Sequence, residues 1–118
     1  MSITVNAKTY TANKFNNNVV GYFGPNNSAL AADKLSLSAT ESQGNTTYSG
    51  DVRGAARFIR TTTLTGALTP SGTAYLDILP KLPRGMASAD IDALLNDAGS
   101  FLSSADGKTW IKSQKTSW

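Results

Sequence analysis

The sequence predicts an α+β fold in one domain, 1–118, with strands first and helices last. Apolar and polar residues alternate over 34–42, 57–65 and 75–82, which is the pattern of strands that bury one face. From residue 88 the apolar residues recur every three or four positions, as in an amphipathic helix. Strands followed by helices favour an antiparallel sheet with the helices segregated at one end of the chain. The length suits a single core with little to spare.

The strand region begins with a hairpin. Short alternating runs on either side of Asn6-Ala7 predict this hairpin over 3–13. An antiparallel sheet of about five strands is predicted over 18–83. Pro80 falls inside the last alternating run, and its missing N–H places it at a sheet edge or a bulge. Turns rich in Gly, Pro and Asn are predicted at Gly24–Asn27, Gln43–Asn45 and Gly66–Gly72.

Two helices are predicted at the end of the chain, over 88–104 and 107–115. Ser88 is a good N-cap residue, and Asp106-Gly107 is the point where the first helix is expected to break. An apolar stripe runs along the first helix, and one sheet with one such helix barely closes a core. We therefore expect a second copy of the chain to cover the stripe, which consists of Ile91, Leu94, Leu95, Ala98 and Leu102.

One face of the predicted sheet is polar, basic and rich in hydroxyls. Because side chains alternate between the two faces of a strand, the apolar members of the three runs share one face, namely Leu35, Leu37, Phe58, Leu64, Leu76, Ile78 and Leu82. The opposite face then carries Lys34, Ser36, Ser38, Thr40, Arg57, Thr61, Tyr75 and Lys81. Hydroxyls, cations and an aromatic ring suit an anionic polymer. A merely solvated sheet face is the commoner meaning of alternating Ser and Thr, and both explanations stay open.

Composition excludes several classes of function. The net charge of +3 permits a nucleic-acid partner without requiring one. There is no cysteine and no histidine, which removes thiolate nucleophiles and the commonest metal ligands, so we expect neither a metal nor a cofactor. The eight carboxylates are scattered singly and no Gly-rich phosphate loop follows a strand, so we expect no enzyme and no small-molecule substrate. No run resembles a signal peptide or a membrane span, which predicts a soluble protein made in the cytoplasm, without a membrane partner.

The order of elements and several local motifs resemble the coat proteins of single-stranded RNA bacteriophages, the levivirus-like family. Residues 15–23 resemble the family's Phe-x-Asn-Gly-Val-x-x-aromatic-apolar strand, with Asn18 where glycine is familiar. Lys34-x-Ser36-x-Ser38 is similar to its RNA-face strand, in which Lys, Thr and Ser alternate. Tyr75-Leu76-Asp77 lies where the family often has Tyr-x-Asn, and the carboxylate of Asp77 would repel phosphate. Residues 87–102 are similar to the first C-terminal helix, so the likeness extends over nearly the whole chain.

The resemblance implies a homodimer in which the two C-terminal helices of one subunit clasp the sheet of its partner. It implies a capsid protein, located in the virion and made in the bacterial host, whose dimers assemble into an icosahedral shell. It also implies that the inner sheet face binds stem-loops of the single-stranded genomic RNA and represses translation of the replicase. The loop marked by Gly66, Pro70 and Gly72 would contact neighbouring dimers around the axes of the shell.

The resemblance also assigns roles on the polar face. Ser36 and Ser38, with Val19 nearby, would line a pocket for an unpaired adenine. The cation of that pocket would be Arg57, from the neighbouring strand. Tyr75 would stack on an unpaired base, since RNA is usually recognised at splayed single-stranded bases. Phosphates would be met by Lys34 and Lys81.

Two other classes of function are considered. Abundant Thr, Ser, Asn and Gly would suit an extracellular fibre or adhesin-like β domain without RNA binding. Such a domain has no use for an amphipathic C-terminal helix, and we expect a signal peptide in it. A small enzyme ranks last. Electron microscopy of the protein expressed alone separates these classes, because a coat protein forms closed particles of uniform size.

Overall fold

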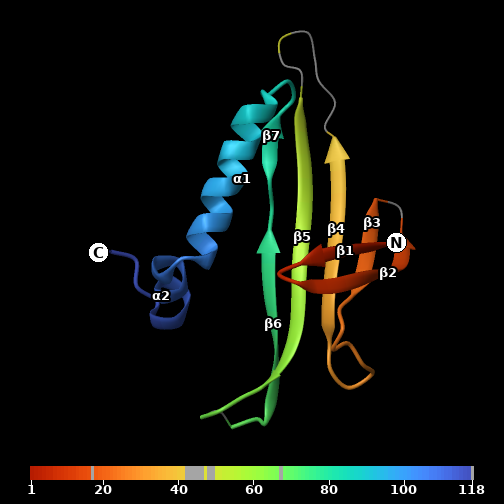
Figure 1. Cartoon of the computed structure of the whole chain (residues 1–118), viewed down its shortest axis with the longest axis vertical. Helices are drawn as coiled ribbons and strands as arrows, with labels where there is room; N and C mark the ends of the chain where they lie inside the picture. Colours follow the sequence, from red (N-terminus) through yellow and green to blue (C-terminus); the bar gives the residue numbers. More distant parts are fainter. Residues whose placement is uncertain (17, 42–46, 48–49, 67, 118) are drawn as a thin grey trace. The chain divides into compact units, whose positions relative to one another are not determined.

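The computed structural model describes residues 1–16, 18–41, 47, 50–66 and 68–117. The chain forms two compact units, Met1–Arg84 and Gly85–Trp118. The first unit is a β-sheet and the second is a pair of helices (Figure 1). This order confirms the predicted α+β fold with an N-terminal hairpin. That both units belong to one domain stays a prediction.

In the described part of the chain, seven strands form one sheet with antiparallel pairings throughout. The order across the sheet is β1-β2-β3-β4-β5-β6, and β7 also pairs with β5 (Figure 1). The strands are more numerous than the five or so predicted, because the hairpin joins the sheet and the last predicted run is divided in two. Their bounds are β1 (Ser2–Val5), β2 (Lys8–Asn16), β3 (Val19–Phe23), β4 (Asp33–Glu41), β5 (Asp51–Thr63), β6 (Ser71–Ile78) and β7 (Lys81–Pro83).

The division between β6 and β7 falls at Pro80. β6 ends at Ile78 and β7 begins at Lys81, so Leu79 and Pro80 belong to neither strand. The carbonyl oxygen of Pro80 still accepts a hydrogen bond from the N–H of Gly54 on β5, at 3.1 Å. Both strands pair with β5 and form the outer edge of the sheet on that side. A residue without an N–H is tolerated at such an edge. Pro80 was predicted at a sheet edge or a bulge, and the structure shows the first of these two.

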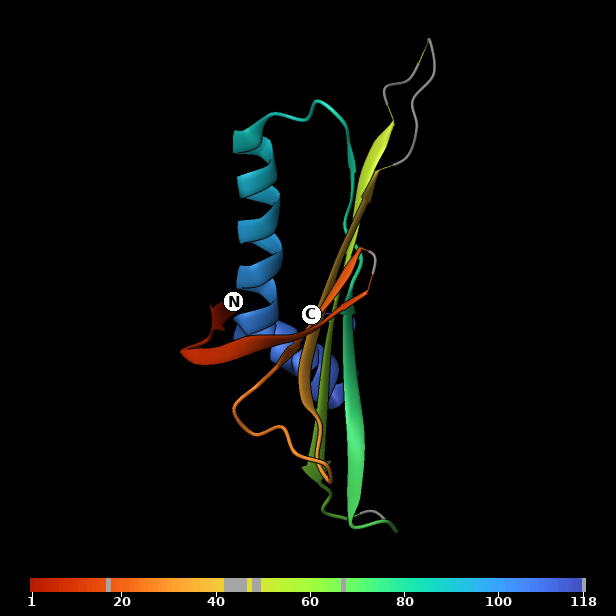
Figure 2. The same cartoon turned by 90° about the vertical axis from the view of Figure 1, so that its right-hand side faces the viewer.

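The N-terminal hairpin turns through Asn6 and Ala7, whose φ angles are 50° and 62°. Two left-handed residues in a two-residue turn match the right-handed twist of the flanking strands. The pairing of β2 with β3 shifts register between Ala12 and Lys14, and such a bulge bends a strand. Figure 2 shows the hairpin extending from one face of the sheet. β2 runs past the predicted end of the hairpin at residue 13, because it also pairs with β3.

The core of the first unit lies between the hairpin and the sheet. Tyr10, Tyr22 and Leu35 are buried, and Leu35 is paired with Tyr22 on β3 and with Phe58 on β5. This is the face on which the alternating leucines were predicted, so the apolar face is confirmed at these positions. Partly buried residues complete the core, namely Ile3, Val5, Ala12, Val20, Leu37 and Phe58.

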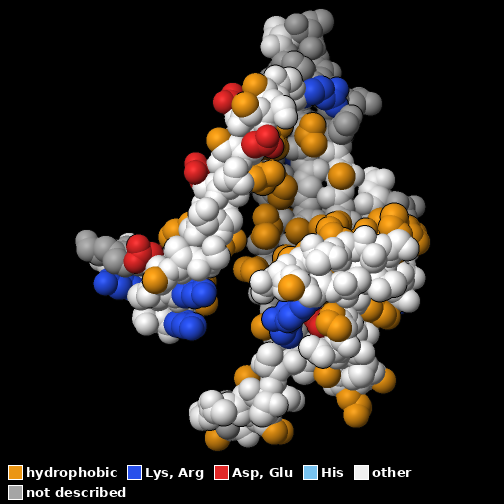
Figure 3. Space-filling view, in the orientation of Figure 1, with side chains coloured by type: hydrophobic (Ala, Val, Ile, Leu, Met, Phe, Trp, Pro, Cys, Tyr) orange, Lys and Arg blue, Asp and Glu red, His pale blue; other side chains and the backbone are white. Residues whose placement is uncertain are grey.

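Part of the apolar face is not covered by the hairpin. Leu76 and Ile78 belong to this face by their pairing with β5, yet 49% of Leu76 and 39% of Ile78 are exposed. Figure 3 shows hydrophobic side chains gathered on the sheet beside the hairpin. Leu64 follows the end of β5, and its side chain lies over Gly72, where an added Cβ would be 3.0 Å from Cδ1 of Leu64. The sheet therefore carries apolar surface that its own unit leaves open.

The loop between β5 and β6 spans 64–70, two residues earlier in the chain than the predicted 66–72. Gly72 is paired with Thr62 inside β6, so its predicted place in the loop is wrong. The N–H of Leu64 donates to the carbonyl oxygen of Pro70 at 2.9 Å and closes the loop. Gly66 has a φ of 76°, a conformation that favours glycine. Ala67 and the turn predicted at Gln43–Asn45 lie outside the described residues.

The second unit contains α1 (Ser88–Ser103) and α2 (Ala105–Ser113). The break lies at Ser104 and not at Asp106-Gly107, which belong to the first turn of α2. Ser104 is the N-cap of α2: its Oγ accepts a hydrogen bond from the N–H of Gly107 at 3.1 Å and donates to the carbonyl oxygen of Phe101 at 2.6 Å. The first helix thus starts at the predicted residue 88 but ends at 103 and not 104, and the second spans 105–113 and not the predicted 107–115.

The helices of the second unit bury little of their own surface. Ala87 holds the N-cap position of α1 without a side-chain cap, so the predicted N-cap, Ser88, is instead the first helical residue. No residue of α1 is buried, and 57% of Leu95 is exposed. The rings of Phe101 and Trp110 lie 5.9 Å apart and join α1 to α2. Within the described residues, no helix is both long and apolar enough to cross a membrane.

Candidate nucleic-acid interface

The pairing register brings the predicted polar residues to one face of the sheet. Directly paired residues of antiparallel strands point to the same side, so each row across the strands shares a face. All the residues predicted to bind RNA fall in such rows, and we call this surface the polar face. The rows are Gly21, Ser36, Arg57 and Asp77; Phe23, Lys34, Ile59 and Tyr75; Val19, Ser38 and Ala55; Thr40, Arg53 and Lys81; and Thr61 with Thr73.

The hydroxyls of Ser36 and Ser38 belong to β4, which has a strand on either side. Both residues are half-buried. Ser36 is paired with Arg57 on β5, and Ser38 is paired with Val19 on β3. The structure thus brings together the residues to which the resemblance assigns an adenine pocket. Their binding of adenine stays a prediction.

Arg57 is held by two hydrogen bonds to the residue opposite it on β6. Its Nε lies 2.7 Å from Oδ1 of Asp77, and its Nη2 lies 3.0 Å from Oδ2. The guanidinium carbon is also 5.8 Å from the centre of the Tyr75 ring. Arg57 therefore lies between a carboxylate and an aromatic face, a contact that sequence reasoning missed because it treated Asp77 only as a repulsive charge.

The ion pair perturbs both of its members. The hydrogen bond from Arg57 holds the pKa of Asp77 below its usual value, although desolvation opposes this shift. The same hydrogen bond, together with the charge of Asp77, raises the pKa of Arg57. Both groups stay ionised at every pH near neutrality, so the pair is a fixed feature of the polar face.

A second carboxylate organises the far end of the polar face. The side chain of Asp51, at the start of β5, is 9% exposed. One of its oxygens, Oδ2, lies 3.7 Å from Nη2 of Arg53 and 3.6 Å from Nζ of Lys81. Both cations remain largely exposed. Lys81, predicted to contact phosphate, therefore carries a charge that is partly balanced within the protein.

Lys34 has a different environment. Its Nζ lies 5.5 Å from the centre of the Phe23 ring, in the same row of the sheet. Phe23 was not predicted on this face, although its alternation with Val19 along the same strand places it there. Lys14 also belongs to the polar face, paired with Gly21. Simple alternation could not place Lys14, because the bulge precedes it.

Thr61 has a structural role that the sequence did not indicate. Its Oγ1 accepts a hydrogen bond from the N–H of Ala32 at 3.1 Å. It also lies 3.3 Å from Oγ1 of Thr73 on β6. These contacts tie the loop that precedes β4 to the edge of the sheet. RNA binding by Thr61 stays a prediction.

The polar face is positively charged on balance. Among the described strand residues on this face, five are Lys or Arg and two are Asp. Such an excess attracts polyanions and makes their binding dependent on salt. The cations are Lys14, Lys34, Arg53, Arg57 and Lys81, and the carboxylates are Asp51 and Asp77.

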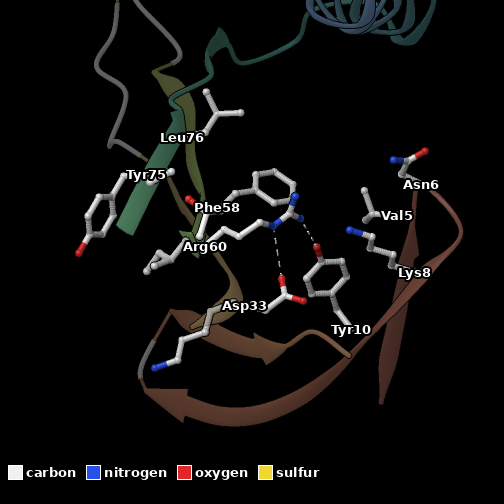
Figure 4. A pocket seen from close by; sticks show the side chains of 13 residues that line it. Val5, Asn6, Lys8, Tyr10, Asp33, Phe58, Arg60, Tyr75 and Leu76 are labelled. Atoms are coloured by element: carbon white, nitrogen blue, oxygen red, sulfur yellow. Dashed lines mark hydrogen bonds and ion pairs between the residues drawn. The ribbon is translucent and has the colours of Figure 1, made fainter. Parts of the chain in front are cut away.

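A pocket of about 370 Å³ lies beside the hairpin, lined by Tyr10, Phe58 and Arg60 among others (Figure 4). Arg60 donates from Nη2 to the hydroxyl of Tyr10 at 3.4 Å, and its Nε lies 3.8 Å from Oδ1 of Asp33. Side chains alternate between the two faces along β5. Arg60, at an even position, therefore lies on the side opposite to Arg57, which is the apolar side of the sheet. Among the described residues, no group of His, Cys, Asp and Glu could hold a metal ion.

The fold of this chain is similar to that of several solved structures, although its sequence matches little. No protein-family model and no curated protein matches the sequence. The virus-like particle of Beihai levi-like virus 32 matches with a TM-score of 0.81 and 13% identity, over 96% of this chain and 91% of that chain. That of bacteriophage GQ-907 matches with a TM-score of 0.75 and 13% identity, over 99% and 90%. The coat protein of bacteriophage EMS014 matches with a TM-score of 0.60 and 17% identity, over 84% and 66%. The resemblance drawn from the sequence is confirmed at the level of fold: the chain has the fold of levi-like virus and single-stranded RNA phage coat proteins.

Proposed function

We propose that this protein is the coat protein of a single-stranded RNA bacteriophage. Its dimers assemble into an icosahedral shell, and it resides in the virion after synthesis in the cytoplasm of the bacterial host. Its role is structural and not enzymatic. The observation that carries this proposal is the likeness of fold, over 96% of the chain, to a protein that forms virus-like particles.

Uncovered apolar surface on each unit supports the dimer. α1 buries none of its residues, and the apolar face of the sheet leaves Leu76 and Ile78 open. Burying one such side chain stabilises a fold by about 1.5–3 kcal/mol. When the helices of one subunit cover the sheet of its partner, this stabilisation is gained only in the dimer, so folding and association become a single event. The residues of α1 at this interface are Ile91, Leu94, Leu95, Ala98 and Leu102.

The polar face supports a role in binding the RNA genome. It combines an excess of cations with hydroxyls and with Tyr75, 63% of which is exposed. In the proposed complex, Lys34 contacts phosphate while Ser36 and Ser38 hold an unpaired adenine beside Arg57. A dimer bound to a stem-loop at the replicase start would also repress its translation. Thr40, Thr61 and Lys81 lie at the margins of this surface.

The decisive experiment is to express the full chain alone in bacteria. We expect closed particles of uniform size by electron microscopy and a sedimentation coefficient far above that of a dimer. Sequencing the RNA extracted from these particles should show enrichment of particular stem-loops. Leu95→Asp is the matched loss-of-assembly variant.

Two outcomes would contradict the proposal. Open fibres or a monodisperse monomer would favour the fibre or adhesin-like alternative. Closed particles that exclude RNA would leave the shell function in place but remove the RNA role of the polar face.

A further inference from the structure

The carboxylate of Asp77 lies in the middle of a surface that otherwise favours anions. An exposed ion pair contributes little to stability, so stability alone gives little reason for an acid at this position. We propose that Asp77 is a positioning residue that fixes the guanidinium of Arg57 against Tyr75, so that Arg57 and Tyr75 form one platform for stacking an RNA base. This inference rests on the proposed RNA binding.

The pairing of the strands fixes the geometry of this platform. Arg57 and Asp77 are directly opposite on β5 and β6, and two hydrogen bonds of 2.7 and 3.0 Å join them. A bidentate contact sets the plane of a guanidinium, whereas a single hydrogen bond leaves it free to rotate. Arg57 is therefore ordered before any ligand arrives.

Tyr75 completes the platform from the next row of the sheet. Tyr75 is paired with Ile59, which makes it a diagonal neighbour of Arg57. The Arg57 guanidinium carbon lies 5.8 Å from the centre of the Tyr75 ring, within the range of a cation–π contact. Half of the Arg57 side chain is exposed, as is most of Tyr75. Bases stack on both aromatic rings and guanidinium planes, so each of the two side chains, held against the other, offers a face on which a base can stack.

The same contact makes Arg57 a weaker phosphate ligand. Asp77 takes one bidentate edge of the guanidinium, through Nε and Nη2, and its carboxylate offsets the positive charge of Arg57. Lys34 lies in the neighbouring row, with its Nζ over the ring of Phe23. The polar face thus divides its cations, with Lys34 contacting phosphate and Arg57 supporting a base.

The test measures RNA binding by full-length dimers carrying Asp77→Asn. The probes are stem-loop RNAs that share one stem and differ only in the loop, including a loop of abasic nucleotides. Each probe is titrated across a salt series. Asp97→Asn, which changes the same charge on exposed α1, is the matched control, and thermal unfolding checks that both variants are folded.

We expect the wild-type dimer to prefer a loop with bases over the abasic loop by about tenfold. Asp77→Asn should reduce this preference to about threefold or less, while binding to the abasic loop becomes tighter. The slope of log K against log salt should steepen by about 0.7–0.9, because Arg57 is released to contact phosphate. Arg57→Lys should also lose the preference, since it keeps the charge but not the plane. In a Tyr75→Ala background, Asp77→Asn should have no further effect on loop preference.

The outcomes separate this inference from the function on which it rests. If wild-type dimers bind none of the stem-loops, both the RNA role and the inference are overturned. If they bind and Asp77→Asn matches Asp97→Asn in loop preference and salt slope, the inference alone is overturned. A uniform loss of affinity for every probe, with an unchanged slope, would likewise mean that Asp77 positions nothing.

Discussion

Asp33 and Arg60 form an ion pair across β4 and β5 in which only the acid is buried. Asp33 is 3% exposed, while about half of the Arg60 side chain is in solvent. The carboxylate also accepts a hydrogen bond from the N–H of Asn26 at 3.2 Å. An added Cβ on Gly24 would lie 2.5 Å from Oδ2 of Asp33. The loop before β4 is therefore packed closely around one carboxylate.

Replacing this carboxylate should destabilise the protein. Asp33→Ala leaves the Asn26 N–H without its acceptor and Arg60 without its buried partner, at a cost of about 1–3 kcal/mol. Thermal unfolding at a fixed protein concentration measures the loss. Asp92→Ala, in exposed α1, is the control and should change little. Equal melting temperatures for the two variants would show that Asp33 does not anchor the loop.

The helix stripe should control association. Leu95→Asp places a charge in the centre of the stripe, and we expect it to abolish soluble assembly. The wild-type melting temperature should rise with protein concentration, as for any obligate dimer. Ser100→Asp, outside the stripe, is the matched control and should still assemble. A melting curve independent of concentration, with a monomer in dilute solution, would contradict the dimer.

Residues of the polar face should separate into two classes. Tyr75→Ala should cost about 1–3 kcal/mol for the preferred stem-loop and little for unrelated RNA. Lys34→Ala should weaken all RNAs alike and reduce the salt slope by about 0.7–0.9. Lys81→Ala should have a smaller effect on the slope, because Asp51 already balances part of its charge. Filter binding across a salt series measures all three, and affinities equal to wild type throughout would leave only a solvated sheet face.

The loop between β5 and β6 should affect the particle and not the dimer. Pro70 closes this loop by accepting a hydrogen bond from the N–H of Leu64. Pro70→Ala keeps this carbonyl but frees the φ angle that the proline ring restricts, so we expect it to change particle size or thermal stability, with unchanged RNA affinity of isolated dimers. Electron microscopy and filter binding read the two properties separately. Loss of RNA binding by the dimers would mean that the loop belongs to the RNA surface.

Loop preference should be constant from neutral to mildly acidic pH. The hydrogen bond from Arg57 lowers the pKa of Asp77. Tyr75 is the other titratable group beside this pair, in contact with Arg57. A carboxylate with a lowered pKa in the folded state contributes stability above its unfolded pKa, and this contribution is lost as the pH falls through the folded pKa. RNA binding measured from pH 8 to about pH 5 should therefore show no transition from this pair. A change in loop preference within that range would contradict the pairing.

Local patterns in the sequence were sufficient for much of the fold. The alternation around Leu35 and Phe58 predicted the apolar face, because a strand has a period of two whatever it packs against. The missing N–H of Pro80 predicted its position at the sheet edge for an equally local reason. The helical spacing from Ile91 predicted α1, which starts at Ser88 as its predicted bounds have it, but the N-cap is Ala87 and not Ser88, since capping depends on how the preceding residue is oriented.

Only the tertiary structure decided which polar residues meet. The sequence by itself placed Arg57 and Tyr75 on one face, but the pairing of Arg57 with Asp77 depends on the register between β5 and β6, which no local pattern encodes. The bulge in β2 moved Lys14 onto the polar face by breaking the alternation. Ser104 ended α1 early because its hydroxyl satisfies groups on both helices at once. Periodicity fixes the side of the sheet on which a residue lies, whereas its contacts depend on long-range register.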